Sequence, residues 1–133
     1  MWITHPSLGF ASAVAAHGKP NHVTIRFRSR LHLRRWREEF PALAAVPVEE
    51  RHLADYRGGR VTITVEAFGE VLRRLAGMTT YGNVKSEAER AWGDDVYVDA
   101  MHEAWGVFLR VQQDAKHQAA PARRTPTPRR LRP

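Results

Sequence analysis

The side chains with the clearest chemical potential in this sequence are a run of arginines near residue 30. Six of the residues from Val23 to Arg37 are arginine and none is acidic. A guanidinium group can bind a phosphate through two parallel hydrogen bonds, so the run predicts a phosphate-binding surface. The candidate nucleic-acid ligands in the run are Arg26, Arg28, Arg30, Arg34 and Arg35.

A second basic element closes the sequence. Residues 117–133 carry five arginines, four prolines and no acid. Arginine-rich disordered segments attract nucleic acid because their charges displace counterions from phosphates, and such segments also occur as solubilising extensions with no ligand. Both interpretations stay open for its candidate phosphate ligands, which are Arg123, Arg124, Arg129 and Arg130.

The arginine run also has an interpretation without a ligand. In a strand over residues 23–28, Arg26 and Arg28 point away from the core, and glutamates at positions 38, 39, 49 and 50 can neutralise part of the charge. Sheets that bind single-stranded nucleic acid present aromatic side chains for base stacking, but Phe27 points to the opposite face. A solvated sheet face is therefore the alternative to a phosphate site.

A polar set later in the chain has the residue types of a pocket or an interface. It comprises Asp55, Tyr56, Tyr81, Asn83 and Lys85. The alternative is a structural corner between helices, because Asn83 suits a helix N-cap and Lys85 stands four residues before Glu89, the spacing of a helical ion pair.

No residue pattern predicts a catalytic, metal or cofactor site. The seven histidines lack the spacing of helical metal-ligand pairs, and cysteine is absent. Glycine-rich nucleotide loops and nucleophile-elbow motifs are absent too. Asp94 and Asp95 stand where a helix would begin, so we expect them to cap it rather than to act as an acid–base pair. We therefore expect no enzyme activity, no metal and no cofactor.

Alternation of apolar and polar residues predicts the strands that would carry these side chains. Residues 23–28 and 60–65 alternate strictly, which is typical of half-buried strands. The apolar run 10–16 precedes a turn-forming segment, so it is expected to pair with the first of these strands as a hairpin. Residues 48–56 form a fourth, weaker candidate.

Helices are predicted where apolar residues recur every three or four positions. Ser29 suits the N-cap of the first helix, and Pro41 ends it. In the last helix Met101, Trp105 and Phe108 share a face, so Trp105 is expected to be buried in the core. The later helices are predicted over residues 66–78, 84–92 and 96–115.

These elements predict an α+β fold. Their order, β-β-α-β-β-α, favours an antiparallel sheet of about four strands with helices on one face, followed by a long C-terminal helix. The same order suggests two similar halves, each a hairpin followed by a helix.

Length and charge divide the chain into two parts. The 133 residues fit one domain, and residues 1–116 are expected to form it. Residues 117–133 are expected to be a disordered basic tail, because they contain too little apolar surface to offset the entropy of ordering. The tail holds five of the net charges, so the domain carries only +2 of the formal +7. The absence of cysteine and of long apolar runs favours a cytoplasmic protein with no membrane contact.

Several short motifs occur together across residues 1–112, namely Met1-Trp2-Ile3, Gly9-Phe10-x-Ser12-x-Val14, Ala54-Asp55-Tyr56-Arg57, Tyr81-Gly82-Asn83-Val84-Lys85-Ser86-Glu87 and Tyr97…His102-x-x-Trp105. Together they resemble a group of small uncharacterised bacterial and phage proteins, whose pattern is Met-Trp, Gly-Phe-x-Ser-x-Val, Asp-Tyr, Tyr-x-Asn-Phe-Lys and a terminal Trp-containing helix. Val84 stands where that pattern has Phe. The resemblance implies a compact cytoplasmic domain of bacterial or phage origin. The group has no established activity, so it assigns no site residue.

The sequence favours a small non-enzymatic interaction or regulatory protein with a protein partner. The alternative is a nucleic-acid-binding accessory protein that uses the arginine run and the basic tail.

Overall fold

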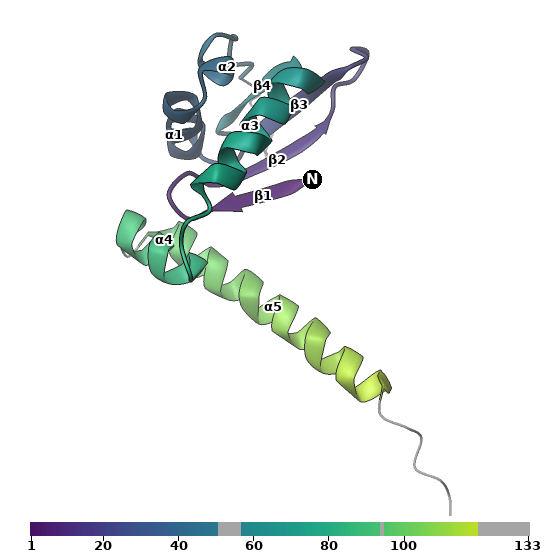
Figure 1. Cartoon of the computed structure of the whole chain (residues 1–133), viewed down its shortest axis with the longest axis vertical. Coiled ribbons are helices and arrows are strands. Elements are labelled where there is room, and N and C mark those ends of the chain that lie inside the picture. Colours follow the sequence, from purple (N-terminus) through teal and green to yellow (C-terminus); the bar gives the residue numbers. More distant parts are fainter. Residues whose placement is uncertain (51–56, 94, 120–133) are drawn as a thin grey trace, which may run out of the picture.

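The computed structural model describes residues 1–50, 57–93 and 95–119 of the chain (Figure 1). Its strands are β1 (Trp2–His5), β2 (Gly9–Ala15), β3 (His22–Phe27) and β4 (Gly59–Thr64). Its helices are α1 (Arg30–Glu39), α2 (Pro41–Ala44), α3 (Val65–Met78), α4 (Val84–Trp92) and α5 (Val96–Ala119).

The four strands form one antiparallel sheet in the order β1-β2-β3-β4. The β2–β3 turn contains two residues with positive φ, Gly18 at 68° and Asn21 at 57°. Glycine adopts this left-handed region without steric cost, and asparagine tolerates it better than most residues. The alternation of β3 then places Ile25 and Phe27 on one face, where both are fully buried.

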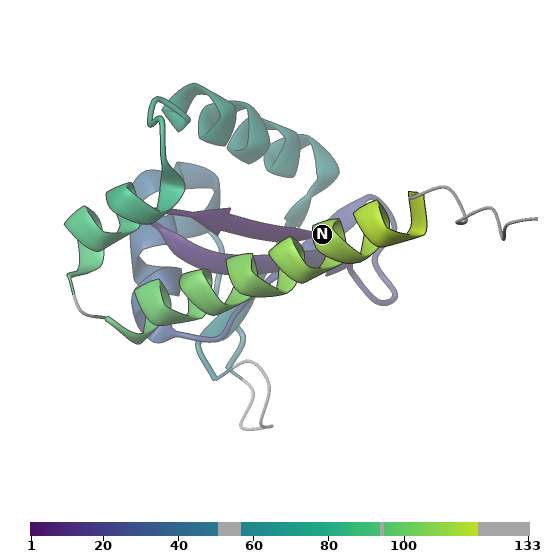
Figure 2. The same ribbon diagram turned by 90° about the horizontal axis from the view of Figure 1, so that it is seen from below.

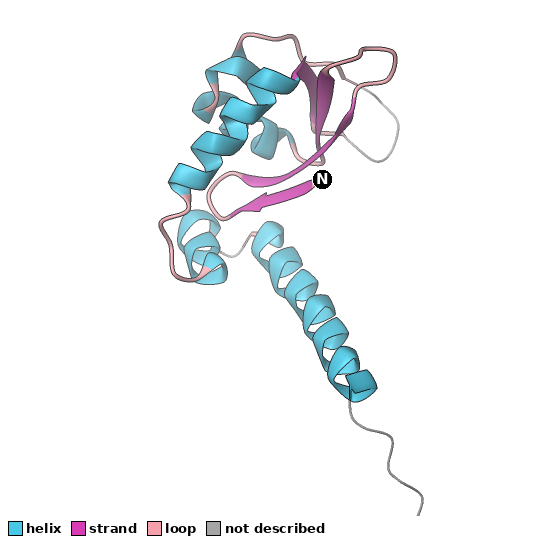
Figure 3. Cartoon of the chain, turned by 45° about the vertical axis from the view of Figure 1, so that its right-hand side comes forward, coloured by secondary structure: helices cyan, strands magenta, loops and turns pink. Residues whose placement is uncertain are grey.

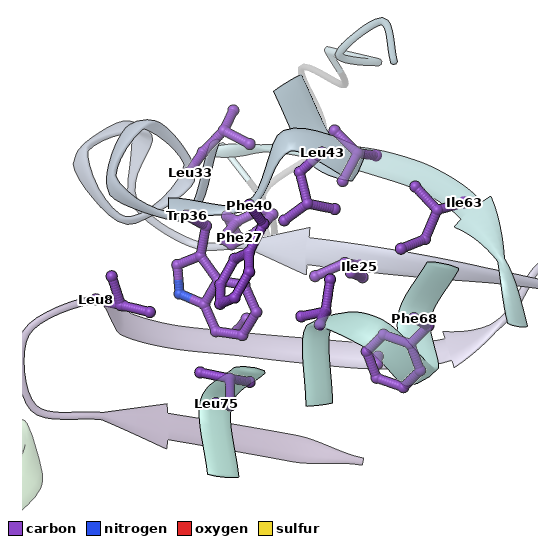
Figure 4. Packing of buried hydrophobic residues seen from close by; sticks show 14 residues of the cluster. Leu8, Ile25, Phe27, Leu33, Trp36, Phe40, Leu43, Ile63, Phe68 and Leu75 are labelled. Atoms are coloured by element: carbon purple, nitrogen blue, oxygen red, sulfur yellow. The ribbon is translucent and has the colours of Figure 1, made fainter. Parts of the chain in front are cut away.

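Helices α1, α2 and α3 cover that inner face of the sheet (Figures 1 and 2). The centre of the core is aromatic: the Trp36 ring lies 5.7 Å from the Phe27 ring and 5.3 Å from the Phe40 ring, measured between centroids. Figure 4 shows these rings surrounded by aliphatic side chains of the strands and helices. Because large aromatic side chains bury the most apolar area per residue, this cluster contributes more to the stability of the domain than its number of residues suggests.

Side-chain caps fix where three of the helices begin. The Ser29 hydroxyl accepts the Leu31 N–H (3.2 Å) at the start of α1, and the Thr64 hydroxyl accepts the Ala67 N–H (3.2 Å) at the start of α3. The Asn83 side-chain oxygen accepts the N–H groups of the two residues that follow Val84 in α4. Each cap satisfies a backbone donor that the helix itself leaves unpaired.

Helices α4 and α5 pack against each other below the β1–β2 turn, outside the main core (Figures 1 and 3). They form a second, smaller cluster around Ala88, Tyr97, Val98 and Met101. From there α5 runs away from the sheet and projects from the domain (Figures 1 and 3). The chain therefore has one main core and one long helix attached to it by only its first turns.

The structure confirms the predicted α+β class and the four-stranded antiparallel sheet. The predicted hairpin is β2–β3, and the predicted strand 60–65 is β4. The predicted helices correspond to α1, α3, α4 and α5, although α5 continues to Ala119, into the segment predicted to be a tail. The rest of that segment, residues 120–133, lies outside the described residues.

The observed order of elements differs from the predicted one at the start of the chain. Three strands precede α1, because Trp2–His5 forms β1 and the sequence analysis predicted no strand there. Among the residues that the structure describes, β4 is the one named strand between α2 and α3, so this part of the chain does not show a second hairpin. Most of the predicted strand 48–56 lies outside the described residues, and within it Glu49 forms an isolated bridge with Arg60.

Among the residues that the structure describes, no helix combines the length and the apolar composition that crossing a bilayer requires.

Replacing the central tryptophan tests this description of the core. Trp36→Ala is expected to lower the free energy of unfolding by about 3–5 kcal/mol, because it leaves a cavity among fully buried rings. Trp105→Ala, measured in dilute solution, is the matched control. Trp105 is 52% exposed and contacts Lys85 by a cation–π interaction, so its loss should cost only about 0.5–1 kcal/mol. Urea denaturation of both variants measures the difference, and equal losses would contradict it.

Candidate interaction surface

Three consecutive backbone carbonyls in the β1–β2 turn, at residues 5–7, each accept a hydrogen bond from a different helix. The Tyr97 hydroxyl of α5 donates to the first (3.0 Å), the Trp92 indole of α4 to the second (2.5 Å), and the Arg35 guanidinium of α1 to the third (2.7 Å). We call these three bonds the turn clamp. Because carbonyls shielded from water need partners, the clamp stabilises the turn and the attachment of all three helices together.

The side chains of the turn clamp also pack on one another. The Arg35 guanidinium lies 3.7 Å from the centre of the Trp92 ring, which is a cation–π contact. The rings of Trp92 and Tyr97 are 5.2 Å apart, and the buried His32 ring of α1 lies edge-on to both. The clamp is therefore one aromatic and polar cluster that fixes the first turn of α5.

Glycine is required where β2 leaves the turn. Gly9 has a φ of 88°, and a Cβ atom there would lie 2.4 Å from the His32 ring. The next residue, Phe10, donates its backbone N–H to His32 Nδ1 (3.3 Å). The His32 ring therefore occupies the space that any other residue at position 9 would need.

Burial determines the protonation of the groups in this cluster. It lowers the pKa of His32, whose Nδ1 accepts the Phe10 N–H. The neighbouring Asp95 opposes that shift and Arg35 adds to it. Burial also lowers the pKa of His5, and it raises the pKa of Tyr97, so that the tyrosine hydroxyl stays protonated and remains a donor.

Beyond the turn clamp, α5 carries apolar side chains that the rest of the described structure leaves exposed. The exposed fractions are 52% for Trp105, 47% for Val107, 69% for Phe108 and 62% for Val111. We call these four residues the α5 apolar arc. The predicted burial of Trp105 is wrong, because its side chain is 52% exposed, whereas Met101, one turn earlier, is buried.

The α5 apolar arc is broad. Successive helical residues are about 100° apart, so its four members cover roughly 160° of the helix circumference. Asp99, Glu103 and Arg110 lie on the opposite side. A helix that packs on one surface needs an apolar stripe about 100° wide. The α5 apolar arc is wider than that, so one flat partner surface would leave part of it exposed.

The predicted polar set is partly assembled around the start of α4. Tyr81 packs edge-on against His5 at 5.9 Å, and Asn83 caps the helix. The Lys85 ammonium lies 4.1 Å from the centre of the Trp105 ring, at the edge of the α5 apolar arc. The first two residues thus hold the corner in place, and Lys85 borders the exposed surface. Asp55 and Tyr56 lie outside the described residues.

The structure divides the arginine run among separate places. Arg35 belongs to the turn clamp, and Arg26 donates to the Ser12 hydroxyl (3.2 Å) on the outer face of the sheet. Arg28 is exposed directly after β3. The run therefore does not form one phosphate-binding surface. The predicted tail ligands Arg123, Arg124, Arg129 and Arg130 lie outside the described residues.

Three members of the run do come together on one side of α1. Arg30, Arg34 and Arg37 line a groove of about 560 Å³, which we call the arginine groove. Arg30 lies 3.5 Å from a carboxylate oxygen of Glu50, and Arg34 lies 3.8 Å from one of Glu38. Guanidinium groups in this arrangement can bind phosphates or carboxylates, in competition with those two glutamates.

The outer face of the sheet carries aromatic side chains, which were not expected there from the sequence. Residues paired across an antiparallel sheet share a face, and the register aligns Trp2, Ser12, Arg26 and Arg60 in one row. Trp2 is 75% exposed and packs edge-on against Phe10 (5.7 Å). The expected lack of aromatics on this face is therefore wrong, although the Glu49 carboxylate neutralises Arg60 at 2.6 Å.

One histidine–serine pair has the residue types of a nucleophile and its base. The Ser7 hydroxyl lies 3.2 Å from His5 Nδ1, but the Ser7 backbone N–H donates to the same nitrogen (3.3 Å). His5 Nε2 is buried without a partner, so no carboxylate orients the ring. Within the described ranges, no three acidic or histidine side chains are placed to hold a metal ion.

Comparison of this chain with protein-family models, with curated proteins and with solved structures finds no match. The arrangement of its own residues therefore carries the functional conclusion.

The sequence analysis missed the turn clamp altogether. Trp92 and Tyr97 donate to carbonyls about ninety positions earlier in the chain, and such pairing leaves no local periodicity. The α5 apolar arc did leave a signal, because its residues follow helical spacing, but the same spacing is expected of a buried stripe.

Acidification is expected to destabilise the protein through its buried histidines. Burial holds the pKa of His32 and of His5 below 6.5 in the folded chain, so below that pH the unfolded chain binds protons more readily. Stability should be constant above about pH 7.5 and fall as the pH drops through 6.5. Urea midpoints between pH 8 and 5 measure this. His32→Gln should flatten the decline, whereas His17→Gln, in the exposed turn, should leave it unchanged. The same decline in all three proteins would contradict the explanation.

Proposed function

We propose that this chain is a small non-enzymatic interaction module, of bacterial or phage origin as its resemblance implies, which binds a protein partner through the α5 apolar arc. The observation that carries the proposal is the exposure of Trp105 (52%) and Phe108 (69%) on one projecting helix. Aromatic side chains grouped on an exposed surface are typical of the centres of protein–protein interfaces.

The domain does not need the arc for its own stability. Its main cluster lies between the sheet and helices α1, α2 and α3, and no residue of α5 belongs to it. Apolar residues that a core does not use are costly to leave exposed, because they lower solubility and promote association. A binding role explains why four of them occur together on the free part of α5.

The surroundings of the arc also suit an interface. The turn clamp holds the start of α5, so the arc is presented by a helix with a fixed origin. Lys85 lies over one edge of Trp105 and supplies a charge at the border of the apolar surface. An apolar centre with a charged rim is the usual arrangement of a specific interface.

Site-directed photo-crosslinking in the cells that produce the protein tests this proposal. A photoreactive phenylalanine analogue at position 108 lies within the α5 apolar arc, and the same analogue at position 113 lies on the other side of the same helix. Irradiation should join the chain to a polypeptide from position 108 and give little product from position 113. Equal products, or no product from either position, would contradict the proposal.

A second candidate function is nucleic-acid binding, and the arginine groove favours it. Three guanidinium groups line this groove, and the tail arginines could extend the contact. Binding to duplex DNA should weaken with salt, and each arginine that neutralises a phosphate contributes about 0.9 to the slope of log affinity against log salt.

Variants of the groove separate a true site from general charge attraction. Arg30→Ala combined with Arg34→Ala should lower the salt slope by about 0.9 for each lost contact. Arg73→Ala, an exposed arginine on α3, is the matched control and should leave the slope unchanged. The groove is not a binding site if both proteins keep the slope of the natural chain.

A further inference from the structure

The apolar residues of α5 follow a more specific pattern than simple amphipathicity. Tyr97, Met101, Ala104, Phe108 and Val111 are separated in turn by four, three, four and three residues. This is the heptad repeat by which one α-helix packs along another. An amphipathic helix on another surface shows similar spacing, and a second helix is the element that this line of residues fits along its whole length.

Only the first residues of the heptad line are buried within the chain. Tyr97 and Met101 are 7% and 9% exposed, because they pack on α4 and the β1–β2 turn. Phe108 and Val111 continue the same line but are 69% and 62% exposed. The line is thus continuous with an existing buried contact and is uncovered only where α5 leaves the domain (Figure 3).

The charges of the residues that flank the heptad line bear on whether α5 can pair with a second copy of itself. In paired helices the flanking residues of one helix meet those of the other, and identical helices with charges there repel. Up to residue 113 of α5 these flanking residues are uncharged, namely Val98, Ala100, Trp105, Val107 and Gln112, and the next flanking position holds Asp114. The charged residues Asp99, Glu103 and Arg110 lie on the far side of the helix. Beside the exposed part of the heptad line, from Ala104 to Val111, no flanking charge opposes the pairing of two copies of α5.

We infer that two copies of this chain associate symmetrically through α5, each covering the Phe108 and Val111 side of the other. The inference rests on the proposed function and names its partner as a second copy. The flanking Trp105 and Val107 side chains widen the contact beyond the heptad line, which explains the breadth of the α5 apolar arc.

The area available sets the strength of this association. A large aromatic side chain buries about 150–250 Å² in full, so the partly exposed Trp105 and Phe108 together with two valines offer roughly 400 Å² in each copy. A total near 800 Å² is small for a permanent dimer and suits a weak, reversible one. The dimer should therefore dissociate on dilution.

Sedimentation equilibrium of the purified full chain over a wide concentration range tests the inference. The average mass should rise from the monomer value of 15.2 kDa towards twice that value. Phe108→Glu should raise the dissociation constant by about thirtyfold or more, the effect of losing one central side chain of an interface. Gln113→Glu adds the same charge on the other side of α5 and should behave like the natural chain.

The outcomes separate this inference from the proposed function. A natural chain that stays monomeric, while position 108 crosslinks to a different polypeptide in cells, overturns self-association and leaves the interaction module standing. A dimer that Phe108→Glu does not weaken overturns the role of α5 in it. A monomer in which position 108 crosslinks only within its own chain overturns both. Val111→Glu repeats the test if Phe108→Glu fails to fold, as judged by circular dichroism.

Discussion

The structure depends on the three hydrogen bonds that close the β1–β2 turn. Each of the carbonyls at residues 5–7 accepts from a side chain of a different helix, so the turn is the point where α1, α4 and α5 meet the sheet. The contacts are mutually dependent, because Arg35 stacks on Trp92 and His32 fills the space beside Gly9. Without them the second cluster would keep the packing of Phe10 as its contact with the sheet, and the origin and direction of α5 would no longer be fixed by hydrogen bonds. The geometry of the candidate interaction surface therefore follows from hydrogen bonds made at the other end of the helix.

The residues that stabilise the main core are different from those of the candidate interaction surface. The aromatic core around Trp36 lies between the sheet and α1, α2 and α3, and it contains no residue of the α5 apolar arc. Changes in the arc should therefore alter binding with little effect on folding, whereas changes in the turn clamp should alter both. The arginine groove lies on α1 and shares no residue with the arc, so the two candidate surfaces can be tested independently.

The parts of the fold that the sequence predicts are those with a local signature. Alternation located β3 and β4, and caps such as Ser29 and Asn83 located two helix starts. β1 was missed because a four-residue strand at the start of the chain is too short for a periodic pattern. Consequently the outer face was expected to lack aromatics, although β1 brings Trp2 to it. Trp105 was misplaced for a different reason: spacing shows which side of a helix is apolar, and it does not show what covers that side.

We have inferred that a second copy of the chain covers the free part of α5, which the turn clamp holds in place. Residue-resolved hydrogen exchange on the natural chain and on Phe108→Glu, at the same protein concentration, tests it most directly. A helix that projects without a partner opens readily and exchanges quickly. We expect protected amides at residues 104–111 in the natural chain and fast exchange there in the variant, with the core strands unchanged in both. Equal exchange of residues 104–111 in the two proteins would contradict it.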